Sequence, residues 1–369
     1  MQERTLQLLA AETLYLQPFS LGLLLRAAWL CLHRCTSLAD LLLRVLVQGA
    51  EPPSRRVRAL LHTLLGACYA LQLEGRGGEH IHVHHGYFAS WIAMVAARLL
   101  DIDFSLTLHG SDLLLHGAYL DTKLKNCAFC VTVSEFNRRF VLQHYPDVDP
   151  GKIMVRRMGV SLPCAEASVQ RSGPQLTILA VGRLHPVKDH AFLLHACHEL
   201  KGRGVSFFCV IAGEGPERPW LAHLIRNLGL EEQVKLVGHL SREQLDICYD
   251  SCDLVVLTSR SEGIPLVLME AMAHGKIVLA PAITGIPELV KDGETGFLYR
   301  SGSLPDFVAK VETILSSSAL PGLRLAARQH VLECFDREKN LAALADLLVS
   351  RITRKVRRHS HENPVLQQI

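Results

Sequence analysis

The sequence has little net charge, which argues against a nucleic-acid-binding protein. It also has no low-complexity tract, which argues against a largely disordered chain. The 39 Lys and Arg side chains nearly balance the 36 Asp and Glu side chains, giving a formal net charge of +3. Because a nucleic-acid-binding surface needs a strong positive field, we expect no nucleic acid among the partners. The one dense basic cluster, residues 351–359, is predicted to be the solvated end of a helix.

A long apolar run is also absent, since no uninterrupted stretch approaches the ~20 residues that a transmembrane helix needs. The leucine-rich segment 14–47 is interrupted by Arg26, Arg34 and Arg44. This spacing predicts helices with an apolar face and a basic edge, which either pack on the domain or rest on an anionic membrane surface. We therefore expect a cytoplasmic protein, with peripheral association at the inner face of the cell membrane as the alternative.

The eleven cysteines lack the arrangement of a disulfide framework or a zinc site. They are scattered, often inside apolar segments, and no cleavable signal peptide precedes them, so a reduced cytosolic compartment fits best. Cys127 and Cys130 have the spacing of a metal or redox motif, but no second pair of ligands follows at zinc-finger distance. We predict that both are core thiols.

Strand and helix patterns alternate along most of the chain, which is typical of an α/β protein. Residues 80–86 and 104–110 are predicted strands that end in Gly, with the helical pattern of 90–100 between them. Periodicity is lost over residues 161–175, where two Pro and a Gly indicate a linker, and the βαβ rhythm then resumes. Two doubly wound α/β domains in tandem are therefore predicted.

In such sheets, ligands bind beyond the carboxyl ends of the strands, so the residues directly after each strand are candidates for a site. After the first strand of the second half comes "VGRLHPVKD", in which Gly182 exposes the backbone while Arg183 and Lys188 supply two cations. This combination suits a diphosphate better than two unrelated surface charges would. "AGEGP" follows the next strand, but its third Gly is missing and Pro216 occupies the turn, so a nicotinamide site is a weak hypothesis.

The stretch "SEGIPLVLMEA" is predicted to be a loop followed by a helix with Pro265 at its first position. The N–H groups at that helix start would stabilise an anionic phosphate. Glu262 lies in the loop and Glu270 in the helix about 8 Å further along, whereas the carboxyls of a retaining hydrolase lie ~5 Å apart. The two glutamates are thus expected to hold opposite ends of an extended ligand.

Two clusters of Asp or His residues resemble metal-binding groups, but we do not interpret either as a metal site. Asp101 and Asp103 come before a strand, at the wrong edge of the sheet for a site, and are predicted to form a turn. On a strand, His82 and His84 share one face and His85 points away, which disfavours chelation by all three. His85, beside Gly86, either lines an acceptor site or packs in the structure.

The second half resembles the nucleotide-sugar-binding domain of retaining glycosyltransferases of family 4, which have the GT-B fold. The resemblance rests on five motifs in order over about 130 residues: "VGRLHPVKD", "AGEGPER", "VKLVGHL", "SRSEGIPLVLMEAMAHGKIVLAP" and "GIPELVKDGETGFLY". In the first half, "TLHGSD" and "VTVSEFNRRFV" resemble the branch that builds exopolysaccharides of the colanic-acid type. It implies two Rossmann-like domains that face a cleft.

The resemblance implies a role for each matching residue. Arg183 and Lys188 would hold the donor diphosphate and stabilise the leaving group, Glu270 would bind the ribose, Glu262 the donor sugar, and His109 would sit near that sugar. The implied catalytic residues are His109, Arg183, Lys188 and Glu262. The implied nucleotide-sugar-binding residues are Gly182, Arg183, Lys188, Glu214, Gly238, Glu262, Gly263, Ile264, Pro265, Leu266 and Glu270. On the acceptor side, the candidates are His85, Gly86 and Asp112.

The same resemblance divides the chain into an acceptor-side domain at 1–165 and a nucleotide-sugar-binding domain at 174–335. A C-terminal helix and basic tail occupy 336–369, and a return of this helix to the first domain is one option. The family opens with a strand, a Gly-rich loop and a second strand, whereas this chain begins with helical patterns. The first domain is therefore expected to lack that N-terminal unit.

Three functions are open at this point. The first is a transferase that moves a hexose from a nucleotide sugar to a glycan or lipid-linked acceptor, with retained configuration and without an obligatory metal or other cofactor. The second is a weakly active or inactive sugar-nucleotide-binding module, owing to the missing N-terminal unit. The third is another GT-B enzyme, such as an epimerase or a phosphorylase. Whether Glu262 acts as a nucleophile stays open, and a front-face substitution is the favoured mechanism.

Overall fold

The structure is a computed structural model, and it describes residues 13, 20–49, 51–114, 117–162 and 175–362, with side chains to residue 353. The chain divides into two compact units. The first unit contains residues 1–108, 116–131 and 145–153, and the second contains 109–115, 132–144 and 154–369. The predicted linker falls largely on 163–174, and the predicted loss of an N-terminal unit concerns 1–12 and 14–19, so both lie outside the described residues.

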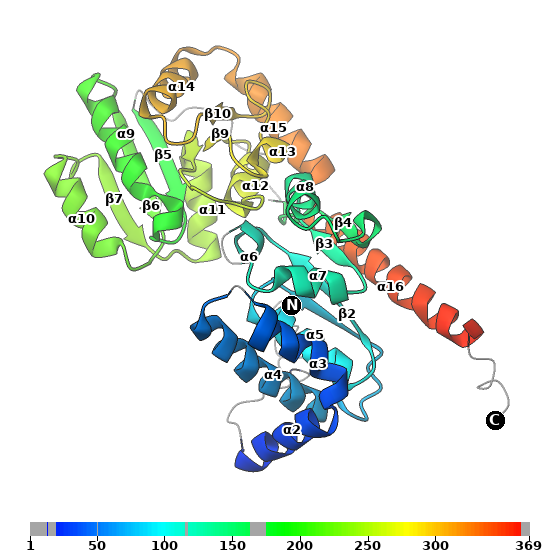
Figure 1. Ribbon diagram of the computed structural model, residues 1–369. Helices are drawn as coiled ribbons and strands as arrows, with labels where there is room; N and C mark the ends of the chain where they lie inside the picture. The colour runs from blue at the N-terminus through cyan, green and yellow to red at the C-terminus, as the bar shows by residue number, and fades with distance from the viewer. Residues whose placement is uncertain (1–12, 14–19, 50, 115–116, 163–174, 363–369) are drawn as a thin grey trace. The chain divides into compact units, whose positions relative to one another are not determined.

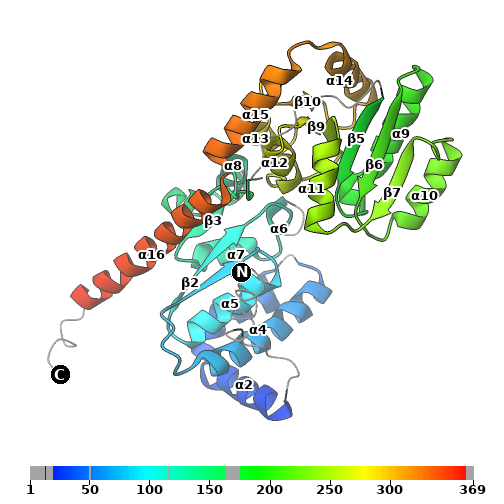
Figure 2. The ribbon, with the colours of Figure 1, turned by 180° about the vertical axis from the view of Figure 1, so that it is seen from behind.

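Helices precede the first described strand of the first unit. They are α2 (Leu21–His33), α3 (Cys35–Leu43), the π-helical η1 (Arg44–Gln48) and α4 (Pro53–Leu73). The hydroxyl of Ser20 caps α2 by accepting the N–H of Leu23 at 3.1 Å, and Pro53 suits the first turn of α4, where no intrahelical N–H bond is lost. The helices α2 and α4 pack against each other, and both views of the ribbon show them crossing at an angle (Figures 1 and 2).

The first sheet has the strand order β1-β2-β3-β4, and β1 and β2 pair in parallel. The strands are β1 (His80–His84), β2 (Asp103–Leu108), β3 (Cys130–Thr132) and β4 (Ile153–Val155). The elements between them are α5 (Phe88–Leu99), α6 (Ser111–Leu114), α7 (Leu120–Asn126), α8 (Glu135–His144) and the 3₁₀ turn η2 (Pro150–Lys152). The alternation of strand and helix predicted from the sequence is therefore present.

The second sheet has six parallel strands in the order β10-β9-β8-β5-β6-β7. Its strands are β5 (Leu176–Val181), β6 (Phe207–Ala212), β7 (Val234–Gly238), β8 (Leu254–Val256), β9 (Ile277–Pro281) and β10 (Phe297–Tyr299). The helical elements are η3 (Pro186–Lys188), α9 (His190–Gly202), α10 (Arg218–Asn227), α11 (Arg242–Ser251), α12 (Leu266–Ala273), α13 (Ile286–Leu289), α14 (Leu304–Ser316), α15 (Leu320–Cys334) and α16 (Arg337–Glu362).

Alternate residues of the central strands enter two separate cores. In β8, Leu254 and Val256 pack with α9, α10 and α14, whereas Val255 packs with α11, α12 and α15. Both faces of the sheet are thus covered by helices, as Figures 1 and 2 show for this unit. The prediction of a doubly wound, Rossmann-like α/β fold is confirmed.

Two local predictions are wrong by about one residue. Pro265 is the N-cap of α12 and not its first helical residue, because its ψ of 121° is extended and helical geometry starts at Leu266. Asp103 belongs to β2 and not to the turn before it, since it pairs in register with His80, while Asp101 does form the turn with φ 55°. Neither shift changes the face on which these residues lie.

The prediction that Cys127 and Cys130 are core thiols is confirmed. Both side chains are buried and unbonded to other cysteines. Burial raises the pKa of Cys127 to about 12, so its thiol stays protonated at neutral pH. Across the described ranges, we find no helix with the length and apolar character needed to cross a membrane.

The contact between α4 and α5 gives a first test of the fold. A Cβ atom at Gly66 would lie 2.7 Å from the side chain of Val95, which is fully buried. Gly66→Ala is expected to lower the free energy of unfolding by about 1–3 kcal/mol, because overpacking forces a shift in this core. Urea denaturation followed by circular dichroism measures the change.

The matched control is Gly322→Ala in α15, where nothing lies within 4 Å of the added carbon. Its free energy of unfolding should stay the same or rise, since Ala favours a helix over Gly by about 0.5–1 kcal/mol. Equal stability of the two variants would contradict the close packing of α4 on α5.

Candidate nucleotide-sugar site

The loops after β5 and β6 touch backbone to backbone, which only glycine permits. A Cβ atom at Gly213 would lie 1.9 Å from the carbonyl oxygen of Gly182, and one at Gly215 would lie 2.3 Å from that of Leu184. Gly213 also has φ 148°, a conformation that other residues rarely adopt. The glycines after these strands thus hold the two loops together. The loops form a surface at the carboxyl edge of the sheet, which we call the wall.

Lys188 and Glu262, 74 positions apart in the sequence, form an ion pair in this wall. The Nζ atom of Lys188 lies 2.5 Å from Oε1 of Glu262, and the two side chains are only 18% and 12% exposed. A pair with little water around it is screened weakly, so each partner strongly fixes the position of the other. Two predicted site residues are thereby brought into direct contact.

The segment that carries Lys188 is fastened to the loop before α12. The Thr258 hydroxyl donates to the carbonyl of Lys188 at 2.9 Å, and Arg260 bonds the carboxylate of Asp189 at 2.7 Å. Asp189 has φ 49°, in the left-handed region where Asp is better tolerated than most residues other than Gly. These contacts hold the ammonium group of Lys188 beside Glu262.

Arg183 and His190 flank Gly182 in different ways. Arg183 is exposed, and within the described part of the chain its side chain has no ion pair or hydrogen bond. The imidazole of His190 is buried, and its Nε2 atom would lie 3.7 Å from a Cβ atom at Gly182. Burial lowers the pKa of His190, so the ring is neutral and supports the loop without adding charge. Of the two cations of this loop, Lys188 is held in place by Glu262, whereas Arg183 is exposed and has no partner among the described residues.

Glu214 and Gly238 are brought together at the ends of β6 and β7. The N–H of Gly213 donates to the carbonyl of Gly238 at 2.7 Å, and a Cβ atom at Gly238 would lie 2.8 Å from Oε1 of Glu214. Glu214 pairs with Arg218 at 3.1 Å in an exposed position. This second cluster offers backbone groups and one carboxylate at the same edge of the sheet.

The backbone of His109 and Gly110, which belongs to the second unit, lies against Gly263. A Cβ atom at Gly263 would lie 1.9 Å from the carbonyl oxygen of His109, and one at Gly110 would lie 2.8 Å from the Gly263 backbone. The buried carboxylate of Asp112 accepts the N–H groups of His109 and Gly110, the latter at 2.7 Å. Asp112 thus shapes this loop, and its predicted role toward an acceptor stays a prediction.

Glu270 lies on α12, as predicted, and is held by two residues that the sequence did not reveal. Its Oε1 atom forms an ion pair with Arg242 of α11, and its Oε2 atom accepts a hydrogen bond from the hydroxyl of Tyr249 at 2.9 Å. Burial, reinforced by the charge of Glu270, raises the pKa of Tyr249, so this hydroxyl remains a donor. The two glutamates are therefore fixed by different partners.

The remaining predicted residues are placed as follows. Ile264 and Pro265 are buried at the start of α12, whereas Leu266 is exposed. His85 and Gly86 belong to the first unit: His85 follows β1 with φ 72°, and the carbonyl of Gly86 accepts a bond from Lys123 at 2.8 Å. In the described residues, no group of three His, Cys, Asp or Glu side chains could hold a metal ion.

Thr258, Arg242 and Tyr249 contact residues of the candidate site and were not singled out from the sequence. Arg260 falls within the stretch 259–265, which the sequence marks as a candidate because it follows a buried strand, and Thr258 directly precedes that stretch. Arg242 and Tyr249 lie in a helix whose pattern looks like any amphipathic surface helix. Only the packing of α11 beside α12 turns them toward Glu270.

The ion pair in the wall leads to a prediction about stability. Glu262→Ala would leave the largely buried ammonium group of Lys188 without its counter-ion, and we expect a loss of about 1–3 kcal/mol in the free energy of unfolding. Glu199→Ala is the matched control, since Glu199 pairs with Arg203 in an exposed position worth less than about 0.5 kcal/mol. Similar urea midpoints for the two variants would refute the pair's structural role.

Relatives of known name cover part of the chain. WcaL of Salmonella typhimurium, named for a role as a colanic acid biosynthesis glycosyltransferase, is 33% identical over 208 residues, which are 54% of this chain and 51% of that protein. The amylovoran biosynthesis glycosyltransferase AmsK of Erwinia amylovora is 33% identical over 205 residues, which are 53% of this chain and 50% of that protein. The chain thus spans about half the length of the curated relatives it matches.

The fold is also shared with a solved structure. The crystal structure of Anabaena Alr3699/HepE with UDP and glucose superposes with a TM-score of 0.65 at 21% identity, covering 78% of this chain and 81% of that one. Together with the two parallel sheets, this likeness identifies the fold as GT-B. Residues 166–329, which contain every part of the wall from Gly182 to Glu270, match the sequence model of the family Glycosyl transferases group 1.

Proposed function

We propose that the chain is a glycosyltransferase that moves a hexose from a nucleotide sugar to a glycan or lipid-linked acceptor in polysaccharide biosynthesis. The observation that carries this proposal is the Lys188–Glu262 pair at the carboxyl edge of the second sheet, inside the segment that matches the family. A cation beside a carboxylate at this edge suits a ligand with a diphosphate next to a sugar. The names of WcaL and AmsK support exopolysaccharides as the product class.

In the proposed complex, the donor lies along the wall. Arg183 is exposed and able to turn toward the diphosphate, while Lys188 is already oriented by Glu262 and the Thr258 contact. Glu270, whose two oxygens are oriented by Arg242 and Tyr249, would accept hydrogen bonds from the ribose hydroxyls. Carboxylate oxygens can each accept more than one bond, so these contacts leave capacity for a ligand.

The proposed reaction transfers the sugar with retention of configuration and without a metal. Negative charge grows on the leaving diphosphate as the bond to the anomeric carbon breaks, and Lys188 and Arg183 stabilise that charge. In a front-face substitution, a leaving phosphate oxygen takes the proton of the acceptor hydroxyl as the new bond forms. Glu262 would then bind the sugar hydroxyls, and the loop at His109 and Gly110, packed on Gly263, would border the sugar.

Donor turnover provides the test of this proposal. Full-length protein is incubated with a panel of radiolabelled UDP-, GDP-, ADP- and dTDP-hexoses, and binding and slow hydrolysis are measured without acceptor. One donor should bind and be hydrolysed, and Lys188→Ala should lower the rate about 10²–10³-fold, since a group that stabilises the leaving charge is removed. Glu262→Ala should also reduce turnover.

The control is Lys201→Ala, which removes an exposed lysine of α9 whose Nζ atom bonds only the Gly229 carbonyl among its described contacts. Its turnover should equal that of the unmodified protein. Donor binding without hydrolysis or transfer in any glycan or lipid-linked acceptor mixture would reject the transferase and favour the binding-module alternative. No binding of any nucleotide sugar would reject both.

We further propose that the acceptor is met at a membrane surface, through peripheral contact of the first unit. Leu21, Leu25, Trp29 and Leu32 recur every three or four residues of α2 and are 63–74% exposed. Such a stripe lies on one helix face, and Arg26 on the same helix supplies positive charge. An amphipathic helix of this kind suits an anionic lipid surface better than water.

Vesicle binding tests this contact. Leu25→Ser and Trp29→Ser together should weaken co-sedimentation with phosphatidylglycerol-containing vesicles at least tenfold, because burying one such side chain contributes about 1.5–3 kcal/mol. Leu325→Ser is the matched control, since Leu325 is equally exposed on α15 of the second unit. Vesicle affinity that is the same for the double variant and the control would contradict the proposed contact.

A further inference from the structure

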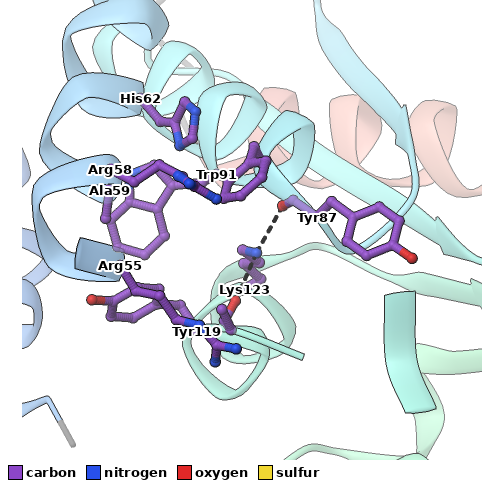
Figure 3. Close-up of a pocket in the computed structure, with 10 residues that line it drawn as sticks. Arg55, Arg58, Ala59, His62, Tyr87, Trp91, Tyr119 and Lys123 are labelled. Carbon is purple, nitrogen blue, oxygen red and sulfur yellow. Dashed lines mark hydrogen bonds between the residues drawn. The ribbon is translucent and has the colours of Figure 1, made fainter. Parts of the chain in front are cut away.

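A pocket of about 380 Å³ lies within the first unit, at the carboxyl end of β1 and beside α4, α5 and α7. Its size is at the lower end of the range for small-ligand sites, which is about 300–1,000 Å³. It is lined by Arg55, Arg58, Ala59, His62, Tyr87, Phe88, Trp91, Ala118, Tyr119 and Lys123 (Figure 3). None of these ten residues carries a carboxylate.

Aromatic rings from different elements form much of the pocket wall. The rings of His62 on α4 and Phe88 on α5 lie 4.5 Å apart, and those of Trp91 and Tyr119 lie 5.0 Å apart. The indole N–H of Trp91 already donates to the hydroxyl of Thr63 at 3.0 Å. Trp91 therefore presents an apolar ring surface to a ligand and no donor.

The base of the pocket is held rigid by Lys123. Its buried ammonium group donates to the carbonyls of Gly86, Tyr87 and Ala118 at 2.8–2.9 Å, and Figure 3 shows the bond to Tyr87 as a dashed line. Gly86 is one of the residues predicted to lie on the acceptor side. The three bonds fix the loop after β1 against the turn before α7, so this side of the pocket is formed in the absence of a ligand.

Arg55 and Arg58 give the pocket positive charge that no acid cancels. Within the described part of the chain, neither guanidinium forms an ion pair, and Arg58 instead lies 5.0 Å from the ring centre of Phe88. Two acids on neighbouring segments, Glu51 and Asp121, are both bound to Arg44. Two cations of α4 are thus available to an anion.

Tyr119 lines the pocket through its ring and not through its hydroxyl. The residue is only 5% exposed, its φ is 55°, and its ring lies 5.0 Å from that of Trp91. The hydroxyl is enclosed, with no hydrogen-bond partner among the described residues. A ligand therefore meets an aromatic surface at Tyr119.

We propose that this pocket binds an acidic sugar, a pyranose that carries a carboxylate or a phosphate, as part of the acceptor. The ring would pack on the aromatic side chains of Trp91 and Phe88, and the anionic group would accept hydrogen bonds from Arg55 and Arg58. This assignment rests on the proposed transferase function, whose acceptor class it names. Charge-assisted bonds to guanidinium are about twice as strong as neutral ones, so an acid is favoured over a neutral sugar.

His62 fits the same ligand as a neutral partner. Burial and the neighbouring charges of Arg58 and Lys123 lower the pKa of His62, so its imidazole adds a hydrogen bond at neutral pH and not a third charge. The residues that would contact the anion come from α4, while the ring surface comes from α5. A single sugar residue could therefore be recognised by its charge and by its apolar face.

Ligand-observed NMR titration of the full chain tests the proposal. The probes are methyl β-D-glucuronide, glucose 1-phosphate, methyl β-D-glucoside and inorganic phosphate. We expect at least one of the two charged sugars to bind at least tenfold more tightly than both the neutral glycoside and phosphate alone, and a preference between them identifies the anion. Equal affinity for neutral and charged sugars, or for phosphate and the better charged sugar, would overturn the proposal.

Variants locate the binding. Arg55→Gln combined with Arg58→Gln should weaken binding of the charged sugar at least tenfold, since the charge-assisted hydrogen bonds to the anionic group are lost. Arg76→Gln, which alters an arginine of the first unit outside the pocket, is the control and should bind normally. Unchanged affinity in the double variant with a normally folded circular-dichroism spectrum would refute the site.

The outcome is separable from that of the donor experiment. A protein that binds the charged sugar through Arg55 and Arg58 but no nucleotide sugar would reject the proposed transferase and support the pocket. A protein that hydrolyses a nucleotide sugar but shows no preference for a charged sugar would support the transferase and reject the pocket. With both sites functional, both ligands should bind, and the double variant should lose binding of the charged sugar while keeping hydrolysis of the donor.

Discussion

Close contact between the backbones of strand-end loops is the constraint on which the rest of the candidate donor site depends. Gly213 and Gly215 rest on the carbonyls of Gly182 and Leu184, and Gly263 rests on the carbonyl of His109. A methyl group at any of these positions would meet a backbone atom that cannot move without its strand. Because the loops touch in this way, the side chains that leave them, including Lys188 and Glu262, start from fixed points.

The two glutamates, Glu262 in the loop before α12 and Glu270 within this helix, differ in the partners that fix them. Glu262 is paired with Lys188 from the loop after β5. A ligand phosphate that approached Lys188 would compete with this carboxylate, and its own interaction would have to compensate for the weakened ion pair. Glu270 is paired with Arg242 and Tyr249 of a neighbouring helix, so a ligand reaching Glu270 meets a carboxylate whose orientation is already set. In the proposed complex, one end of the wall would change its contacts when the donor binds, while the other end would keep its orientation.

Much of the fold and part of the site could be predicted from the sequence for local reasons. The strands of the second sheet are mostly short apolar runs, several of them followed by Gly, and their alternation with helical patterns predicted the doubly wound fold. Glu262 and Glu270 were recognisable because Gly263, Pro265 and the helix are adjacent in sequence. Arg242 and Tyr249 were not, since their contact with Glu270 spans 21 to 28 positions and depends on how α11 packs beside α12.

The pocket of the first unit escaped sequence reasoning for a similar reason. Arg55 and Arg58 have the sequence pattern of the exposed face of an amphipathic helix. Tyr119 has a left-handed backbone conformation that no sequence pattern predicts. The sequence pointed only to the neighbouring His85 and Gly86, which follow a strand.

This difference has a consequence for specificity. The proposed donor site depends on glycine backbones in close contact, so it tolerates change at few positions. The pocket is built from side chains on helices, which can change one at a time without disturbing a strand. If both proposals hold, chains that share the donor site can differ in the sugar that they accept, and Arg55 and Arg58 are the positions that would set the specificity of this chain.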